Sequence, residues 1–359
     1  MATEYTTNHP LAVKVWSKKL MAEAIAATYI GKFIGTSKDS LIYRKDELAK
    51  SAGDKITYGL RMKLTGTGVQ GDDTLEGQEE DLTTYSDSIL INQLRHATRS
   101  KGKMSEQRVP FDLRQENMEG LRDWWAERWD ISLANQLAGN TVQTDTRYTG
   151  NNATLAASTN NILLPPGIST DPASLSSTDT FTLSLIDSCV ARAKTMDQLS
   201  TTQPIIRPIM VDGNEKFVMF LHPWQVKQMR TTTSDGQWLD IQKAVVSGGA
   251  RTNNPIFTGA LGEYNGVVLH EWTRLPKAVA VAGTAVNDTR VAVFCGAQAA
   301  CIAFGKGDGR PNSMDWVEEK FDYQNQLGVS AGAIFGLKKT RFNSKDFSTI
   351  VVPTYATAS

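Results

Sequence analysis

Apolar and polar residues alternate from Ile56 to Leu64, where every second side chain is apolar. Such alternation is typical of a strand with one buried face. A second run of this kind extends from Tyr85 to Ala97, after a connection far longer than a tight turn. The two runs predict a long β-hairpin within residues 51–110. Because a long hairpin with a polar tip rarely buries itself in its own subunit, we expect it to reach a neighbouring one.

A helical period follows the second run. Apolar residues recur at every fourth position and predict one long helix over residues 112–138: Leu121, Trp125, Trp129, Leu133 and Leu137. Gly139 and Asn140 supply the stop signal. At the usual rise per residue, this helix would be about 35 to 40 Å long. The row of tryptophans is typical of a packed core stripe, and the alternative is a platform that stacks on bases or sugars.

Weaker patterns fill the rest of the chain. Residues 11–34 fit an amphipathic helix, whereas residues 141–177 have no periodicity and predict a surface excursion. Further helices are expected from Asp179 with Thr178 or Asp179 as cap, from Pro223, over 238–246 and, as one or two turns, over 296–301. Strands are expected at 205–211, 217–221, 267–272, 290–294, 314–323, 333–339 and 348–354. This mixture lacks regular β-α-β alternation, which favours an α+β fold over a doubly wound sheet.

The composition excludes several classes of protein. The 359 residues carry 38 basic and 38 acidic side chains, so the chain lacks the basic excess of a dedicated nucleic-acid binder. The polar stretch Met1–Pro10 and the charged segment after it fit neither a signal peptide nor a membrane span. Cys189, Cys295 and Cys301 have no metal-binding spacing, and we expect reduced, buried, inert thiols.

The charges of the predicted hairpin are segregated. Its acidic residues come first, without an intervening Lys or Arg: Asp72, Asp73, Glu76, Glu79, Glu80, Asp81 and Asp87. Basic residues follow directly: Arg95, Arg99, Lys101, Lys103 and Arg108. An acidic tip and a basic base suit head-to-tail contact with a copy of the same chain. The alternative is an ordinary solvated loop.

No catalytic or metal site emerges from the motifs. Gly328-Val329-Ser330-Ala331-Gly332 matches a nucleophile elbow, but no histidine follows Ser330 to complete a triad, so a serine hydrolase is only an alternative. The glycines of residues 305–310 match no phosphate-binding fingerprint. The four histidines are scattered, and no pair of carboxylates is set apart by an apolar setting. We therefore expect no catalytic residue, cofactor or metal, which favours a structural or binding protein.

The order of these parts resembles the HK97-like fold of tailed-bacteriophage major capsid proteins. That fold runs from an N-terminal arm through an extended β-hairpin loop and a long spine helix to peripheral and axial domains. Four local segments are similar to the N4-type coat protein group: 53–58, 71–77, 221–223 and 254–262. The resemblance implies an N-terminal arm at 1–50, an extended loop at 51–110, and a spine helix and peripheral domain at 111–203 that includes the excursion at 141–177. It further implies an axial domain at 204–303 and a return to the peripheral domain at 304–359.

The resemblance also implies a function. A protein of this kind self-assembles into the hexamers and pentamers of an icosahedral phage head enclosing double-stranded DNA, and an encapsulin-like nanocompartment shell is the alternative. Its partners would be further copies of itself, scaffolding, portal and decoration proteins, and packaged DNA bound without sequence specificity; no membrane is involved. It would be made in the bacterial host cytoplasm, reside in the virion and perform no catalysis. Lys14, Lys18 and Lys19 of the arm would touch the genome or a scaffolding protein, or simply form a solvated helix face.

In this setting, nine charged residues are the candidates for contact between subunits. They are Asp72, Asp73, Glu76, Glu79, Glu80, Arg95, Arg99, Lys101 and Lys103.

Overall fold

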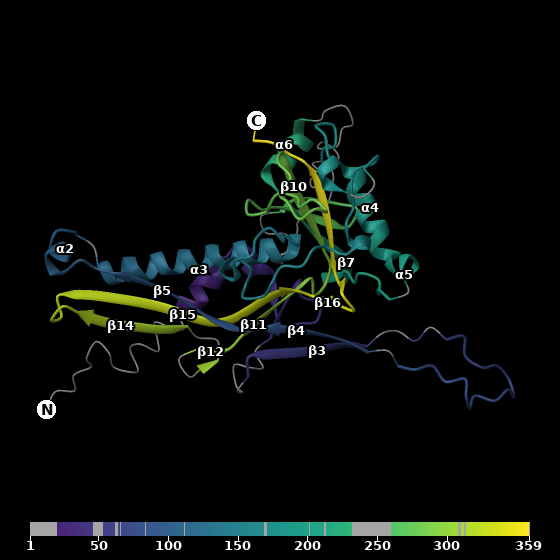
Figure 1. Cartoon of the computed structure of the whole chain (residues 1–359), viewed down its shortest axis with the longest axis horizontal. Coiled ribbons are helices and arrows are strands. Elements are labelled where there is room, and N and C mark those ends of the chain that lie inside the picture. The colour runs from purple at the N-terminus through teal and green to yellow at the C-terminus, as the bar shows by residue number, and fades with distance from the viewer. Residues whose placement is uncertain are drawn as a thin grey trace.

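The computed structural model describes residues 20–45, 53–61, 64, 66–82, 84–110, 112–168, 171–200, 202–211, 213–231, 260–307, 310–311 and 314–358. It has a long helix lying along one sheet, an upright lobe with a second sheet, and a hairpin that extends from the body (Figure 1). The expected helix at 238–246, the lysines of the arm and most of the segment 254–262 lie outside the described residues.

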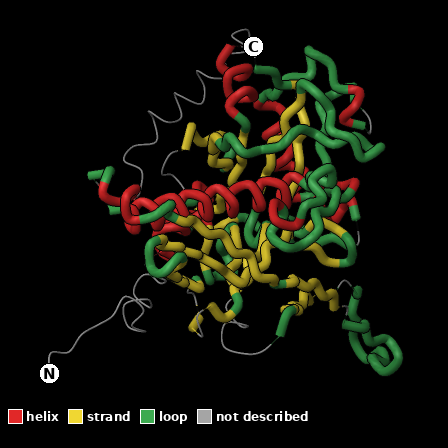
Figure 2. The backbone as a smooth tube through the Cα atoms, turned by 60° about the vertical axis from the view of Figure 1, so that its left-hand side comes forward, coloured by secondary structure: helices red, strands yellow, loops and turns green. Residues whose placement is uncertain are grey.

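Helix α3 (Leu113–Ala138) forms the centre of the molecule. It begins where the Asp112 carboxylate accepts a hydrogen bond from the Arg114 N–H, and it ends at Gly139, whose φ of 68° is left-handed. Trp125 and Trp129 are buried, as the core interpretation of the tryptophan row predicts. Figure 2 shows this helix crossing the middle of the molecule, with strands both below it and above it.

The first sheet has six strands in the order β1-β2-β11-β15-β14, with β5 also paired to β15. Their bounds are β1 (Ile34–Gly35), β2 (Ile42–Lys45), β5 (Asn92–Arg99), β11 (Ala300–Phe304), β14 (Asp315–Phe321) and β15 (Gln326–Lys339). Alternate residues of β15, among them Val329, Ala331 and Phe335, face α3 and share its hydrophobic core. Short pieces flank this sheet: helical residues 20–27, η1 (Tyr29–Phe33), α2 (Lys103–Gln107), β12 (Lys306–Gly307), β13 (Arg310–Pro311), β16 (Arg341–Phe342) and β17 (Lys345–Asp346).

The second sheet builds the upright lobe in the order β18-β10-β7-β9-β8, with β6 paired to β7. Its strands are β6 (Ile209–Val211), β7 (Asn214–Leu221), β8 (Ala260–Tyr264), β9 (Val267–Glu271), β10 (Thr289–Cys295) and β18 (Thr349–Tyr355). One face, with Phe217 and Phe294, packs against α4 (Leu183–Lys194), α5 (Met196–Leu199) and α6 (Pro223–Thr231). The other face, with Val218 and Phe220, joins the core around α3. The helix α3 therefore ties the two sheets together.

The projecting hairpin consists of β3 (Lys55–Arg61) and β4 (Thr84–Leu90), which pair antiparallel. The second alternating run of the sequence is divided between two sheets, because residues 92–99 form β5 and pair with β15 instead of β3. Alternation predicts which face of a strand is buried but does not name its partner. The hairpin is therefore shorter than the run that suggested it.

Four local expectations are corrected. In the described part of the helix expected at 11–34, only residues 20–27 are α-helical, because the N–H groups of Tyr29 and Ile30 donate to Asp130 and the chain continues as η1 and β1. The second helix begins at Leu183 after Thr182, because the Asp179 carboxylate instead closes a turn by accepting from Ser176 N and Oγ. Residues 296–301 form no helix; the chain crosses there from β10 to β11, and Ala299 N donates to Leu41 O. The segment 141–177 is not only a surface excursion, since its Asn152 and Asn161 are buried. It contains the short turns η3 (Thr146–Tyr148), η4 (Thr159–Asn161) and η5 (Pro172–Ser174).

Candidate functional site

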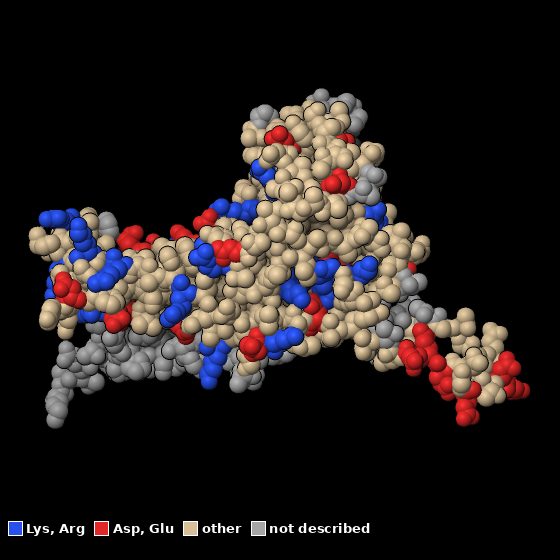
Figure 3. All heavy atoms as spheres, viewed as in Figure 1, with Lys and Arg blue, Asp and Glu red and all other residues tan. Residues whose placement is uncertain are grey.

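The acidic candidates gather at the outer end of the hairpin. Asp72, Asp73, Glu76, Glu79 and Glu80 are all exposed, and Figure 3 shows the acidic side chains of this segment at the far end of the molecule. Glu80 has a second role, because its Oε2 accepts a hydrogen bond from Gly66 N at 2.6 Å and joins the two sides of the tip. Leu64, Leu75 and Leu82 are exposed by 56, 59 and 54%. Apolar side chains left in water on a projecting tip are typical of a surface that meets a partner.

The basic candidates lie at the opposite end. Arg95 and Arg99 are exposed on β5, and Lys101 and Lys103 are exposed where the chain enters α2. Figure 1 places α2 at the end of the long axis farthest from the hairpin, and basic side chains cover this end in Figure 3. The structure thus keeps the two charge groups apart within one subunit. An acidic tip cannot be neutralised by its own basic end.

On the face of β5, β15 and β14 that points away from α3, the middle of β15 contributes small residues: Gly328, Ser330 and Gly332. The central row of this face is Val317, Ser330 and Ala97, which lie side by side in register. On the same face, a Cβ added at Gly332 would lie 2.8 Å from Arg95 Cγ, and one added at Gly328 would lie 2.7 Å from the Phe321 ring. The two glycines therefore let these long side chains lie flat on the sheet. Arg99 in turn stacks over the Phe321 ring at 4.2 Å.

This register also tests the hydrolase alternative. Ser330 lies inside β15 rather than on a strained turn, and its Oγ donates to Val317 O at 3.5 Å. His96 pairs with Ala331 in the neighbouring strand, but its ring stacks on Trp124 of α3, with centroids 4.4 Å apart. Side chains of adjacent positions in a strand point to opposite faces, so the serine and this histidine lie on different sides of the sheet. The geometry of a nucleophile and its base is not formed here.

The remaining reactive side chains serve the core. Cys189, Cys295 and Cys301 are free and buried, and burial raises the pKa of the Cys189 thiol to about 12. Burial lowers the pKa of His222 to about 4, with the nearby Arg290 adding to the effect. Within the described residues, no group of three His, Cys, Asp or Glu side chains is placed to hold a metal ion. The described helices include none that is both long and apolar enough to cross a membrane.

Two contacts of buried charged side chains are among those that sequence reasoning missed. Lys339 Nζ lies 2.9 Å from Asp346 Oδ2, and both side chains are almost completely buried. Asp130 of α3 accepts hydrogen bonds from the N–H groups of Tyr29 and Ile30, and burial raises its pKa to about 6. The only signal for Asp130 was its position beside the tryptophan stripe, where a charge interrupts an apolar helix face.

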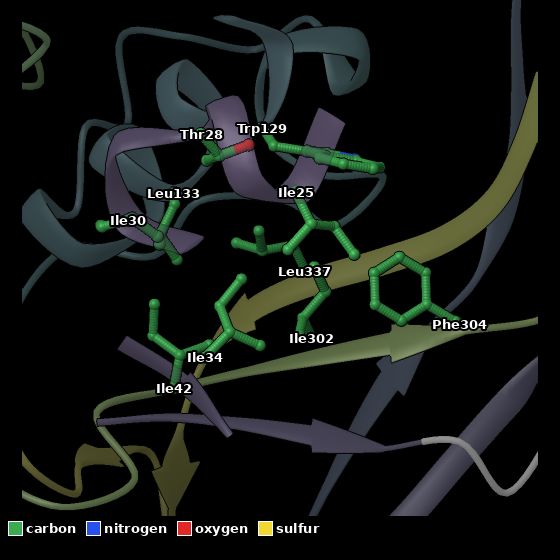
Figure 4. A pocket seen from close by; sticks show the side chains of 10 residues that line it. All are labelled: Ile25, Thr28, Ile30, Ile34, Ile42, Trp129, Leu133, Ile302, Phe304 and Leu337. Carbon is green, nitrogen blue, oxygen red and sulfur yellow. The ribbon is translucent and has the colours of Figure 1, made fainter. Parts of the chain in front are cut away.

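The Asp130 contact fixes the N-terminal segment against the body. Beside it lies a small apolar void between helical residues 20–27, α3 and the first sheet (Figure 4). The lining is apolar except for the Thr28 hydroxyl, whose Oγ1 donates to Ala24 O at 2.8 Å: Ile25, Thr28, Ile30, Ile34, Ile42, Trp129, Leu133, Ile302, Phe304 and Leu337. A void without free polar groups is a packing space rather than a ligand site.

Comparison with known proteins accounts for this architecture. The family model described as "Phage capsid protein" matches residues 4–358. The major capsid protein of Pseudomonas phage KPP25 is 31% identical over 375 residues, covering 94% of this chain and 93% of that protein. The capsid of Ralstonia phage GP4 has a TM-score of 0.80 at 35% identity, with 99% of both chains covered. The Cyanophage Pam1 capsid asymmetric unit has the same fold, with a TM-score of 0.72 at 21% identity over 93% of this chain and 94% of that one.

The parts described above agree with this match. The long helix and the projecting hairpin are two parts that the sequence led us to expect of an α+β, HK97-like capsid fold. The match extends over nearly the whole chain, so it includes the hairpin and both sheets. The chain therefore belongs to the phage capsid protein family and is a major capsid protein with the HK97-like fold.

Proposed function

We propose that this capsid protein assembles into the hexamers and pentamers of an icosahedral head that encloses double-stranded DNA. The hairpin tip of each subunit would contact the basic end of its neighbour. One observation carries this proposal: the acidic tip and the basic end lie at opposite ends of the same subunit (Figure 3). Opposite charges held apart in one copy are complementary between two copies related head to tail.

The energy of this contact would be spread over many weak interactions. Exposed ion pairs contribute about 0 to 1 kcal/mol each, so Asp72, Asp73, Glu76, Glu79 and Glu80 would set the register of the tip more than its affinity. The exposed Leu75 and Leu82 would supply apolar contact beside them. A shell repeats the contact in every subunit, and small energies then sum to a stable lattice.

A charge-reversal experiment tests the proposal. Lys is introduced at Asp72, Glu76, Glu79 and Glu80, and assembly is followed by sedimentation and electron microscopy. We expect fewer closed shells, because the reversed tip repels the basic end of the neighbour. A control with Lys at the exposed Asp39, Asp123, Asp197 and Glu215 changes net charge equally and should assemble normally.

A compensating variant identifies the partner surface. In the tip-reversed chain, Glu also replaces the four basic residues Arg95, Arg99, Lys101 and Lys103. This restores opposite charges at every head-to-tail contact, and assembly should recover. Unchanged assembly of the tip-reversed chain alone would contradict the contact. Loss without recovery would assign the tip to another surface of the neighbour.

Further partners follow from the proposed role. Scaffolding, portal and decoration proteins would bind the shell, and packaged DNA would contact its inner face without sequence specificity. A zero net charge suits a shell that lines DNA without binding it tightly. The protein would be made in the host cytoplasm, enter the virion and perform no catalysis. Nuclease-protected DNA in purified particles would support a phage head, whereas an enzyme cargo would indicate a nanocompartment.

A further inference from the structure

The hairpin joins the body through a bend of one residue. Strand β4 ends at Leu90 and β5 begins at Asn92, so the chain passes from the hairpin to the first sheet within Ile91. The Asn152 side chain holds this bend through both backbone polar groups of Leu90: its Oδ1 accepts from Leu90 N at 3.0 Å, and its Nδ2 donates to Leu90 O at 2.9 Å. A Cβ added at Gly336 would lie 2.0 Å from Leu90 O. The bend therefore lies directly on the backbone of β15.

A single carboxylate then links both hairpin strands to the body. Asp87 of β4 accepts hydrogen bonds from Tyr58 Oη of β3 and from Arg341 N, both at 3.0 Å, and it forms an ion pair with Lys338 Nζ. Lys338 also donates to Ser88 O at 3.0 Å. The Asp87 and Lys338 side chains are only 8 and 15% exposed, so water weakens this contact little. The sequence placed Asp87 with the acidic tip, but the structure gives it an internal role.

The joint has its own small core. Ile56, Ile89, Cys301 and Ala303 form a hydrophobic cluster separate from the two main cores. It fixes the first residues of the hairpin against β11, and the Tyr58 ring adds an edge-on contact to Phe342 with centroids 5.9 Å apart. Beyond Asp87 the hairpin becomes exposed at Gly59, Ser86 and Thr84. Asp87 thus lies where the anchored part of the hairpin meets the projecting part.

A contact at this place controls where the tip points. Gly77 of the tip precedes Asp87 by ten residues, so a fully extended segment places it up to about 33 Å from the joint. A rotation of about 10° at the joint would then move the tip by about 6 Å, more than the reach of an ion pair. A small rotation of the hairpin at Asp87 therefore causes a large displacement of the tip.

We propose that Asp87 is a positioning residue for assembly, which fixes the direction of the hairpin in the free subunit before a neighbour is met. The proposal rests on the proposed contact between hairpin and neighbour and adds that the direction is set in advance. A hairpin held in its binding direction loses less conformational freedom when it docks. Asp87 achieves this through three donors that come from β3, β15 and β16.

The test uses the full-length chain before and after assembly. In D87A the three donors lose their acceptor, and we expect amides of residues 55–61 and 84–90 in the unassembled subunit to exchange hydrogen about tenfold faster. Amides of α3 should be unchanged, and fewer closed shells should form. D87N keeps the side-chain size and an acceptor for Tyr58 and Arg341 N, so it should fold and show an intermediate effect on both readouts.

A matched variant controls for loss of charge. D197N removes an exposed carboxylate on α5 and should leave both readouts as in the wild type. Unchanged exchange of the hairpin amides in both D87A and D87N would overturn the proposal, and so would faster exchange with normal assembly. The two proposals can fail separately. The tip-reversed chain tests the contact between subunits, and its hairpin amides should exchange at the wild-type rate even if assembly fails. Hydrogen exchange in the unassembled Asp87 variants tests only the joint.

Discussion

For the buried pair of Lys339 and Asp346, we predict that removing the carboxylate costs more stability than removing the ammonium. In D346A, Lys339 Nζ keeps only Leu155 O, at 3.3 Å, as an acceptor among the described residues, although its side chain is only 2% exposed. In K339M, Asp346 keeps Ser158 N at 3.1 Å and the Arg341 guanidinium at 3.1 Å. Removing the carboxylate therefore leaves a poorly compensated charge, whereas removing the ammonium does not.

The expected magnitudes follow from this asymmetry. Breaking a buried pair by deleting one partner costs about 3 to 5 kcal/mol, so D346A should lose that much of the free energy of unfolding. Methionine fills the space of the lysine stem, so K339M should lie within about 1 kcal/mol of the wild type. Burial already lowers the pKa of Lys339 despite the nearby Asp346, which shows that its charge is costly in this position.

Urea unfolding of the unassembled subunit, followed by tryptophan fluorescence, measures both variants. The wild type and a K194M chain, whose lysine is exposed on α4, serve as references. Equal losses in D346A and K339M would refute the reasoning, because they would mean that the Coulombic attraction outweighs the cost of burying the ammonium. A more stable D346A would refute it as well.

Two further predictions concern the long helix. The folded-state pKa of Asp130 is raised from 3.8 to about 6, so the folded chain binds this proton more tightly than the unfolded chain; stability should fall by about 2 kcal/mol as pH rises from 4 to 7. In D130N this part of the pH dependence should vanish. If urea unfolding gives the same dependence of stability on pH for D130N and the wild type, the prediction is wrong. W125A should cost about 3 to 5 kcal/mol because Trp125 is 0% exposed. W124A should cost less than half as much, since Trp124 is partly exposed and stacks on His96; equal losses would contradict the core role of the stripe.

The elements that the sequence predicted well are those whose signal is local. Helix α3 depends on a repeated apolar spacing, an N-cap at Asp112 and a left-handed Gly139, and each lies within the segment itself. The start of α6 at Pro223 is equally local and was found as expected. The strands β6 and β7 were found as well, although the first is shorter than the expected 205–211 and the second begins three residues before the expected 217. The capsid family followed from the order of such elements, and the family match confirms it.

The elements that were missed depend on distant partners. Residues 92–99 alternate like a hairpin strand, but pairing with β15, more than two hundred residues later, decides their sheet. The Asp87 and Lys338 contact spans 251 residues, and the roles of Gly332 and Gly336 appear only when Arg95 and Leu90 lie against them. Periodicity predicts a buried face, whereas the identity of what covers it is fixed by the tertiary fold.

The length of α3 also limits how the protein can change in size. Its 26 residues span about 39 Å and carry buried side chains along the length of the helix. An insertion of one or two residues would rotate everything beyond it by about 100° or 200° and turn Trp125 or Leu133 out of the core. Seven residues keep the phase to within about 20° and lengthen the helix by about 10 Å. The length of this helix can therefore change only in large steps, and relatives that differ in subunit length along this axis should differ by whole pairs of helical turns.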